Sequence, residues 1–136
     1  MMRYFWIIFS FLLLMASCGD GVEHHLEGKW QLRTVEENGV VHPVDTVWYN
    51  FQTSLFSYQV FDASANKHVQ NYGYKTLEDD SRLELELVNY GRLTAQQFVE
   101  RYTDWNSKKE FFHIQEISRK KLVLSRDGKT YVFRKY

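Results

Sequence analysis

Apolar and polar residues alternate at every second position through most of this chain, and this spacing constrains its fold more than any other feature. Leu83, Leu85 and Leu87, for example, alternate with Glu84 and Glu86. Because successive side chains of a β-strand point to opposite faces, the spacing predicts strands with one buried face. Eight such stretches occur, around residues 30–34, 47–51, 56–60, 72–74, 83–87, 112–114, 122–124 and 131–133.

Turn and helix signals separate these stretches. Asn38-Gly39 and Asp127-Gly128 are residue pairs that tolerate the positive φ angles of tight hairpin turns. Thr94 and Gln97 have the spacing of a helix capping box, and apolar residues on one helical face follow them. We therefore expect one short helix, over about residues 95–104, before the last three strands.

An all-β fold follows from this order of elements. Antiparallel strands joined in sequence favour an eight-stranded up-and-down barrel, since closure removes exposed strand edges. Gly73 lies inside a predicted strand, where glycine often marks a bend such as a barrel corner. A β-sandwich of similar size is the alternative that the same pattern allows.

The first 17 residues differ from the rest of the chain. Arg3 is the only charged residue before Asp20, and an apolar run separates the two. The run is shorter than the ~20 residues that a helix needs to cross a bilayer, so it is typical of a secretory signal peptide. A short membrane helix kept in the mature protein is the alternative. Residues 14–18, Leu-Met-Ala-Ser-Cys, resemble the bacterial lipobox.

In lipobox proteins the signal is removed just before the cysteine, and the cysteine receives lipid. The resemblance implies a signal peptide over residues 1–17, a lipidated Cys18 with a short tether to residue 25, and one domain over residues 26–136. It also implies a bacterial cell-envelope protein that its lipid holds on the membrane. Gly19 follows the cysteine, where an aspartate would retain an enteric lipoprotein at the inner membrane, so we expect the outer membrane, on its periplasmic or surface face.

The predicted domain opens with Leu26-Glu27-Gly28-Lys29-Trp30 and ends with strands that are rich in aromatic residues. This pattern resembles the Gly-x-Trp opening of lipocalins and related calycin barrels, and the small lipocalin-like lipoproteins of Bacteroides-type bacteria. The resemblance implies that Gly28 and Trp30 lie at the closed end of the barrel and that Arg134 covers the Trp30 ring. A guanidinium group over an indole ring is favourable by ~0.5–2 kcal/mol.

No catalytic constellation is found in the sequence, so we expect a protein that is not an enzyme. There is no Gly-x-Ser-x-Gly motif, and Glu84 and Glu86 fit the solvent face of a strand. The histidines lack the spacing of metal ligands, so neither a metal nor another cofactor is expected. Removal of residues 1–17 takes away only Arg3 among the charged residues, and the resulting balance does not favour a nucleic-acid partner.

The barrel interior is the remaining candidate site. An eight-stranded barrel is just wide enough to be filled by side chains or to hold one small ligand. We expect a small apolar or amphipathic ligand, lined by the aromatic residues Tyr49, Phe51, Phe56, Tyr58, Tyr72 and Tyr74. The alternative is an interior packed solid, in a protein-interaction module of the envelope that exposes Trp48, Tyr90 and Trp105.

Overall fold

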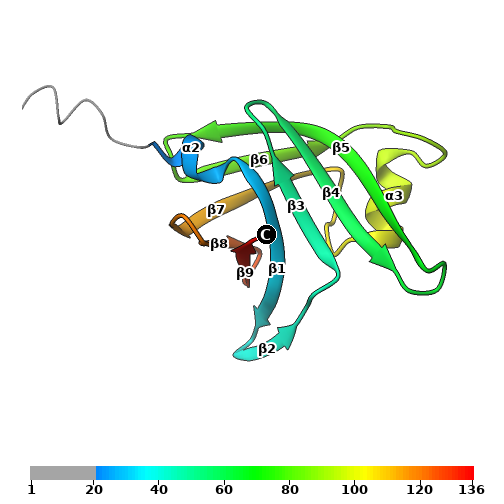
Figure 1. Ribbon diagram of the computed structural model, residues 1–136, viewed down its shortest axis with the longest axis horizontal. Helices are drawn as coiled ribbons and strands as arrows, with labels where there is room; N and C mark the ends of the chain where they lie inside the picture. The colour runs from blue at the N-terminus through cyan, green and yellow to red at the C-terminus, as the bar shows by residue number, and fades with distance from the viewer. Residues whose placement is uncertain (1–20) are drawn as a thin grey trace, which may run out of the picture.

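The computed structural model describes residues 21–136, so the predicted signal peptide and Cys18 lie outside the described residues. Two short helices and nine strands are found in the described part (Figure 1). In chain order they are α2 (Val22–Leu26), β1 (Gly28–Glu37), β2 (Val40–Pro43), β3 (Val47–Phe51), β4 (Leu55–Asp62), β5 (Lys67–Glu78), β6 (Arg82–Leu87), α3 (Ala95–Tyr102), β7 (Lys109–Ile117), β8 (Lys121–Arg126) and β9 (Lys129–Lys135).

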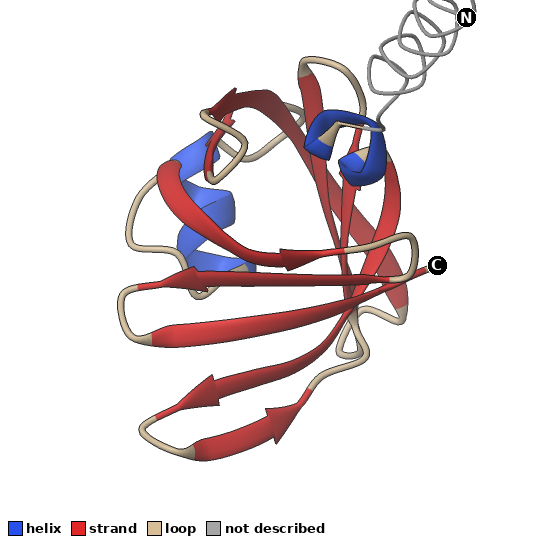
Figure 2. Cartoon of the chain, turned by 90° about the vertical axis from the view of Figure 1, so that its left-hand side faces the viewer, coloured by secondary structure: helices blue, strands red, loops and turns tan. Residues whose placement is uncertain are grey.

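The strands form one antiparallel sheet that closes on itself. Each strand from β3 to β9 pairs with the next, β1 pairs with β3, and β1 also pairs with β9. β1 and β3–β9 therefore make a closed eight-stranded barrel, whose curved wall is seen in Figure 2. The predicted barrel, with its short helix before the last three strands, is confirmed. The sandwich alternative is wrong, because the β1–β9 pairing joins the two edges of a single sheet.

β2 is an additional strand that the alternation did not predict. Asn38 and Gly39 form the expected tight turn, with φ angles of 53° and 76°, and β2 folds back along the second half of β1. All residues of β2 are exposed, so this strand lacks the buried face that alternation reveals. Pro43 is tolerated in β2 because the strand lies at the edge of the sheet.

The two helices lie at opposite ends of the barrel, called here the α2 end and the α3 end (Figure 1). α3 begins at Ala95 as predicted and ends at Tyr102 rather than near residue 104. Its capping box is complete, because Thr94 Oγ1 accepts a hydrogen bond from Gln97 N at 3.1 Å and Gln97 Oε1 accepts one from Thr94 N at 2.9 Å. α2 occupies residues that the sequence assigned to the tether, and it is the first element of the described residues.

Trp30 lies at the α2 end and is fully buried. Its Nε1 donates a hydrogen bond to Leu26 O at 2.8 Å, which fastens α2 across this end of the barrel. Lys135 is paired directly opposite Trp30, its Nζ lies 4.5 Å from the centre of the Trp30 ring, and it donates a hydrogen bond to Glu27 O. Gly28 lies directly beside the Lys135 side chain, where a Cβ atom would come within 2.7 Å of Nζ. Its φ of 117° is also a conformation that favours glycine.

The expected cover of Trp30 by Arg134 is wrong. Arg134 pairs with Gln31 rather than with Trp30, and its side chain is exposed. Side chains alternate between the two faces of a strand. Lys135 therefore shares the inward face of Trp30, and Arg134, one residue earlier, points to the outer surface. Lys135 takes the role that the sequence assigned to Arg134.

We expect Trp30→Ala to lower the free energy of unfolding by about 3–5 kcal/mol, because it leaves a cavity at the α2 end. Chemical denaturation measures this change. Arg134→Ala is the matched control, and as a surface substitution it should change the free energy of unfolding by less than about 0.5 kcal/mol. A Trp30→Ala protein as stable as the native protein would show that this ring does not hold the α2 end together.

Candidate functional site

Four of the six aromatic residues predicted to line a ligand cavity lie inside the barrel: Tyr49, Phe51, Phe56 and Tyr58. Their side chains pack against one another and against other aromatic rings. The ring centre of Tyr49 lies 4.8–6.3 Å from those of Phe51, Phe56, Tyr58, Trp105, Phe112 and Phe133. These are the distances of touching aromatic pairs, so the middle of the barrel is filled by the protein's own side chains.

The expectation that Tyr72 and Tyr74 face the interior is wrong. They are 38% and 57% exposed and lie on the outer surface of β5. Directly opposed residues of paired strands share one face, and the interior residue Phe56 is opposed by Gly73 on β5. Gly73 therefore points inward, and its two neighbours point outward. A Cβ atom on Gly73 would collide with the backbone of Glu86, so this inward position accepts only glycine.

Two inward-facing polar residues of β5 were not identified from the sequence. Asn71 and Lys75 are 1% and 5% exposed, and neither Asn71 Nδ2 nor Lys75 Nζ has a hydrogen-bond partner among residues 21–136. Burial lowers the pKa of Lys75, and the charges of Glu23 and Glu27 at the α2 end oppose that shift. Both residues share the phase of Gly73, but the pairing of Gly73 with Phe56, rather than the alternation, shows that this phase faces inward.

We expect Lys75→Met to raise the free energy of unfolding at pH 7 by on the order of 1 kcal/mol, because methionine removes a buried ammonium group. The folded-state pKa of Lys75 lies below its unfolded value of ~10.5, so the unfolded chain binds this proton more tightly. The stability that the native side chain contributes therefore increases as the pH rises from the lowered pKa towards ~10.5. The variant should lack this increase.

Urea denaturation at a series of pH values measures both effects. Lys120→Met replaces an exposed lysine and serves as the control, which should follow the native pH dependence. A Lys75→Met protein that is less stable than the native protein at pH 7 would contradict the prediction. It would mean that attraction to the nearby carboxylates stabilises the buried ammonium group by more than its loss of hydration destabilises it.

The α3 end is closed by α3 and by Trp105, which follows it. Phe98 of α3 packs against Tyr58, with ring centres 5.8 Å apart, while Trp105 stacks on Phe56 at 5.9 Å. Trp105 Nε1 donates a hydrogen bond to Tyr49 Oη at 3.0 Å, so the indole is also anchored to the centre of the barrel. These contacts close the end of the barrel that lies opposite α2.

The surface patch expected from Trp48, Tyr90 and Trp105 is not formed. Trp105 is 5% exposed inside the barrel, and Trp48 is 9% exposed. Trp48 lies on the outside of β3, where Lys29 and the rings of His68 and Tyr136 cover it. Tyr90 alone of the three is exposed.

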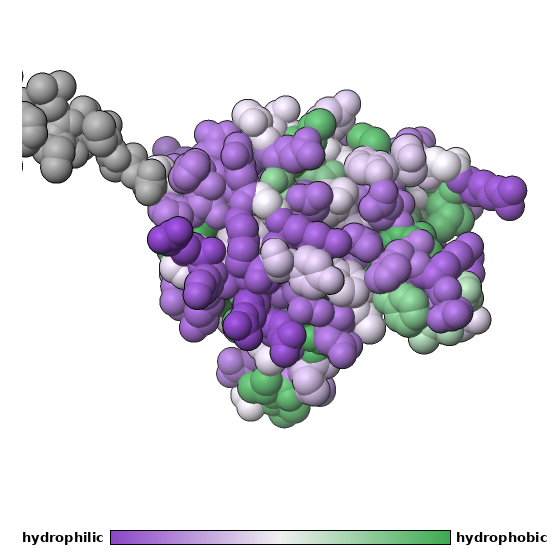
Figure 3. All heavy atoms as spheres, viewed as in Figure 1, coloured by the Kyte–Doolittle hydropathy of each residue, from purple (hydrophilic) through white to green (hydrophobic). Residues whose placement is uncertain are grey.

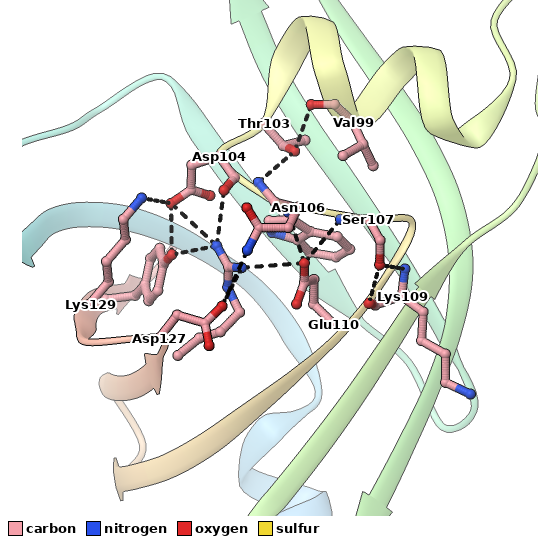
Figure 4. A network of polar contacts seen from close by, with 12 residues as sticks. Val99, Thr103, Asp104, Asn106, Ser107, Lys109, Glu110, Asp127 and Lys129 are labelled. Atoms are coloured by element: carbon pink, nitrogen blue, oxygen red, sulfur yellow. Dashed lines mark hydrogen bonds and ion pairs between the residues drawn. The ribbon is translucent and has the colours of Figure 1, made fainter.

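A buried arginine holds the segment around Trp105 in place. Figure 4 shows the polar network to which it belongs, with Asp104, Glu110 and Asp127 labelled. Arg126 is 6% exposed and donates hydrogen bonds to Asp104 O and to Tyr131 Oη, both at 3.0 Å. Its Nη1 lies 3.3 Å from Glu110 Oε1, which also accepts hydrogen bonds from Asn106 N and Ser107 N. The guanidinium group thus ties residues 104–110 to the β8–β9 hairpin.

Tyr131 completes this network. Its hydroxyl donates a hydrogen bond to Asp104 Oδ2 at 2.7 Å. Burial, and then the hydrogen bond and charge of Asp104, raise the pKa of Tyr131 well above its usual value, so the hydroxyl stays protonated and remains a donor. Both terminal nitrogens of Arg126 have partners, and only its buried Nε has none among residues 21–136, which makes the network a structural support rather than an open binding site.

A cleft of about 450 Å³ opens on the outside of the α3 end, between the β4–β5 hairpin, the loop before α3, and α3 itself. Apolar side chains line its inner part: Val69, Leu93, Phe98 and Tyr102. Three exposed cations lie around it, namely Lys67, Arg92 and Arg101, and none of them forms an ion pair with another part of residues 21–136. In Figure 3, hydrophobic residues gather at this end of the molecule, and separate hydrophobic groups lie around β2 and along the upper edge.

Asp62 joins the two walls of this cleft. Its Oδ2 accepts a hydrogen bond from Tyr102 Oη of α3 at 3.1 Å, and its Oδ1 accepts hydrogen bonds from Ser64 Oγ at 2.6 Å and from Ala65 N at 3.2 Å. The Ser64 hydroxyl is the main cause of the lowered pKa of Asp62. These neutral donors orient the carboxylate but do not remove its negative charge, so the cleft holds one anion and three cations.

A larger hollow, of about 680 Å³, lies outside β7–β9 but is more open to solvent. The buried cation at its floor is Arg126, whose guanidinium group already has partners. Arg82, on its rim, stacks over Phe111 at 4.2 Å. The cleft beside α3 is thus the better-formed of the two sites.

Residues 21–136 contain neither a metal site nor a membrane-spanning helix. No group of three or more His, Cys, Asp and Glu side chains in this range is placed to hold a metal ion. The helices of the same range include none long and apolar enough to cross a membrane.

A family model for the lipocalin-like domain matches residues 12–136. The chain belongs to this lipocalin-like family. It is similar to a lipocalin-like protein from Bacteroides uniformis, with 28% identity and a TM-score of 0.71 over 82% of this chain and 99% of that one. An uncharacterized protein from Bacteroides eggerthii matches with 28% identity and a TM-score of 0.68 over the same shares. No curated protein matches the chain. The resemblance inferred from Gly28 and Trp30 is confirmed.

Proposed function

We propose that this lipocalin-like protein binds a small amphipathic molecule with an anionic group in the cleft beside α3. The observation that carries the proposal is the pairing of an apolar inner wall with three unpaired cations in one cleft of about 450 Å³. That volume falls within the usual range of small-molecule sites, which are mostly apolar with a few polar groups that fix orientation. The anionic group would lie against Lys67, Arg92 and Arg101, with the apolar part along Leu93 and Phe98.

The family and the packing of the barrel support this location. Lipocalin-like proteins are generally binding proteins rather than enzymes, and the barrel fold is compatible with a ligand-binding role. The centre of this barrel, however, is occupied by the rings around Tyr49. A ligand at the periphery needs no displacement of those rings, whereas a ligand in the centre would have to expose them to solvent.

The packed interior also favours a second candidate, a protein-interaction module of the envelope. Its surface would not be the one expected from the sequence, because Trp48 and Trp105 are covered. Native mass spectrometry of the protein purified from its own host separates the two candidates. A retained small molecule supports the first, and a co-purifying protein supports the second.

Binding of dodecanoate, followed by isothermal titration calorimetry, tests the cleft. We expect dodecanoate to bind at least about tenfold more tightly than dodecanol or dodecyltrimethylammonium, because only the anion interacts favourably with the three cations. Arg92→Gln combined with Arg101→Gln should remove this preference while leaving the apolar wall intact.

Arg119→Gln is the control for that experiment, since Arg119 is an exposed arginine in the β7–β8 turn at the α2 end. It should bind dodecanoate like the native protein. Equal affinities for the three amphiphiles would refute a cationic binding cleft. If the double variant still preferred dodecanoate, the anionic group would have to bind elsewhere on the molecule.

We further propose that the protein is a lipoprotein of the bacterial cell envelope, anchored through Cys18 and facing the periplasm or the surface at the outer membrane. The lipobox-like residues 14–18 support this proposal. Each buried methylene group contributes ~0.8 kcal/mol, so several acyl chains hold a protein on a bilayer where one chain does not.

Intact-protein mass spectrometry tests the anchor. The native protein should begin at Cys18 and carry the added mass of acyl chains. Cys18→Ser should keep residues 1–17 and gain no acyl mass, whereas Gly19→Ala should be processed like the native protein. Detection of residues 1–17 on the native protein, or of an unmodified Cys18, would exclude the lipoprotein assignment.

A further inference from the structure

The outer surface of β3, β4 and β5 carries a row of uncharged hydrogen-bonding side chains. Strand register places Asn50 opposite Ser57, and Ser57 opposite Tyr72, so the three form one line across three strands. Directly opposed Cβ atoms lie ~4.5–5.5 Å apart, which keeps these groups within reach of one small ligand. The Asn50 amide and the Ser57 and Tyr72 hydroxyls can each donate and accept hydrogen bonds.

Tyrosine rings stand beside this row. Tyr72 and Tyr74 occupy successive outward positions of β5, and Tyr74 is the more exposed of the two at 57%. The hydroxyl of Tyr72 accepts a hydrogen bond from Gln70 Nε2, and its ring packs edge to face against Tyr90 at 4.7 Å. These contacts hold the Tyr72 ring in one orientation, while Tyr74 remains open to solvent. Exposed aromatic side chains grouped in this way mark binding surfaces.

A small hollow of about 110 Å³ lies within the row, and its lining contains no charged side chain: Asn50, Gln52, Leu55, Phe56, Ser57 and Tyr72. The nearest cation along the row is Lys29, opposite Asn50, and its ammonium group lies over the rings of Trp48 and Tyr136. The hollow thus offers a ring face together with amides and a hydroxyl, but no free charge.

We propose that this surface, the Asn50–Ser57–Tyr72 row with Tyr74, is a binding site for a neutral carbohydrate. A sugar ring presents an apolar C–H face that can pack on a tyrosine ring, and hydroxyl groups at its edge that match amides and hydroxyls. The lining of the hollow offers no charge to pair with a charged ligand, and Glu86, opposite Tyr74, would repel an anionic one at the edge of the site. An apolar segment would bury the partly exposed Asn50 amide without a partner, which is unfavourable, while Ser57 is already only 9% exposed.

The proposed sugar site is independent of the cleft beside α3. The lining of the hollow and the lining of the cleft have no residue in common. Two residues of the cleft lining touch Tyr72: Tyr90 packs against its ring, and Gln70 donates a hydrogen bond to its hydroxyl. The tests below therefore leave Tyr90 and the three cations of the cleft unchanged, and failure of one site does not bear on the other.

Titration of the full soluble domain with millimolar cellohexaose, xylohexaose, mannohexaose and maltohexaose tests the proposal, followed by calorimetry and by NMR shifts of the Asn50 and Gln52 amides. We expect at least one of these neutral oligosaccharides to bind. Tyr72→Ala should weaken that binding by about tenfold, and Tyr72→Phe, which keeps the ring, should largely preserve it. Asn50→Ala is a second variant that removes hydrogen bonds without touching a tyrosine.

Phe111→Ala is the matched control, because Phe111 is a 40% exposed aromatic residue on β7, away from this surface. It should bind like the native protein. Binding to none of the four oligosaccharides overturns the proposal, as does tighter binding of the anionic hexagalacturonate. Self-association that Tyr74→Ala abolishes would assign this surface to a second copy of the chain and would also overturn it.

Discussion

Pairing between β1 and β9 is the contact on which the remaining structure depends. It joins the two edges of the sheet, so that every inward position along the strands faces a shared interior. The same pairing places Lys135 opposite Trp30 and brings the chain end to Glu27. A shift of one residue in this register would turn the inward side chains of β9 outward, Phe133 among them. The same strand pairing therefore closes the barrel and covers its α2 end.

Aromatic packing then decides where a ligand can go. Eight strands enclose only enough room for side chains or for one small molecule, and here the rings around Tyr49 take that room. Trp105 adds a lid at the α3 end, and the buried charge of Arg126 holds that lid. Because both ends are sealed and the centre is filled, the hollows for other molecules lie on the outside, beside α3 and on the surface of β3–β5.

Much of the fold could be predicted, because it depends on local patterns. Alternation located the barrel strands, and the spacing of Thr94 and Gln97 located α3. β2 was missed because an exposed strand has no buried face to detect. α2 was missed because five residues contain too few turns to show a helical period.

The site was harder to predict, because face and register depend on partner strands. The sequence around Gly73 alternates in either phase, and only the pairing with Phe56 shows that the glycine is inside and the tyrosines are outside. The sequence likewise does not show whether Arg134 or Lys135 covers Trp30, because only the strand register places Lys135 opposite the ring. The cleft beside α3 joins residues 62–70 to residues 90–102, and local periodicity carries no signal for such a contact.

The positions of the two helices bear on how a lipid-anchored form would meet its ligand. Cys18 precedes Val22 by a few residues, so a lipid on Cys18 would hold the α2 end against the bilayer. The cleft lies at the α3 end, and β5, which runs between the ends, has 12 residues. At ~3.3 Å per residue, and with the tilt of barrel strands, the two ends are on the order of 30 Å apart. An anchored molecule would thus present its cleft to the aqueous side, where an amphipathic ligand arrives from solution or from a carrier rather than directly from the supporting bilayer.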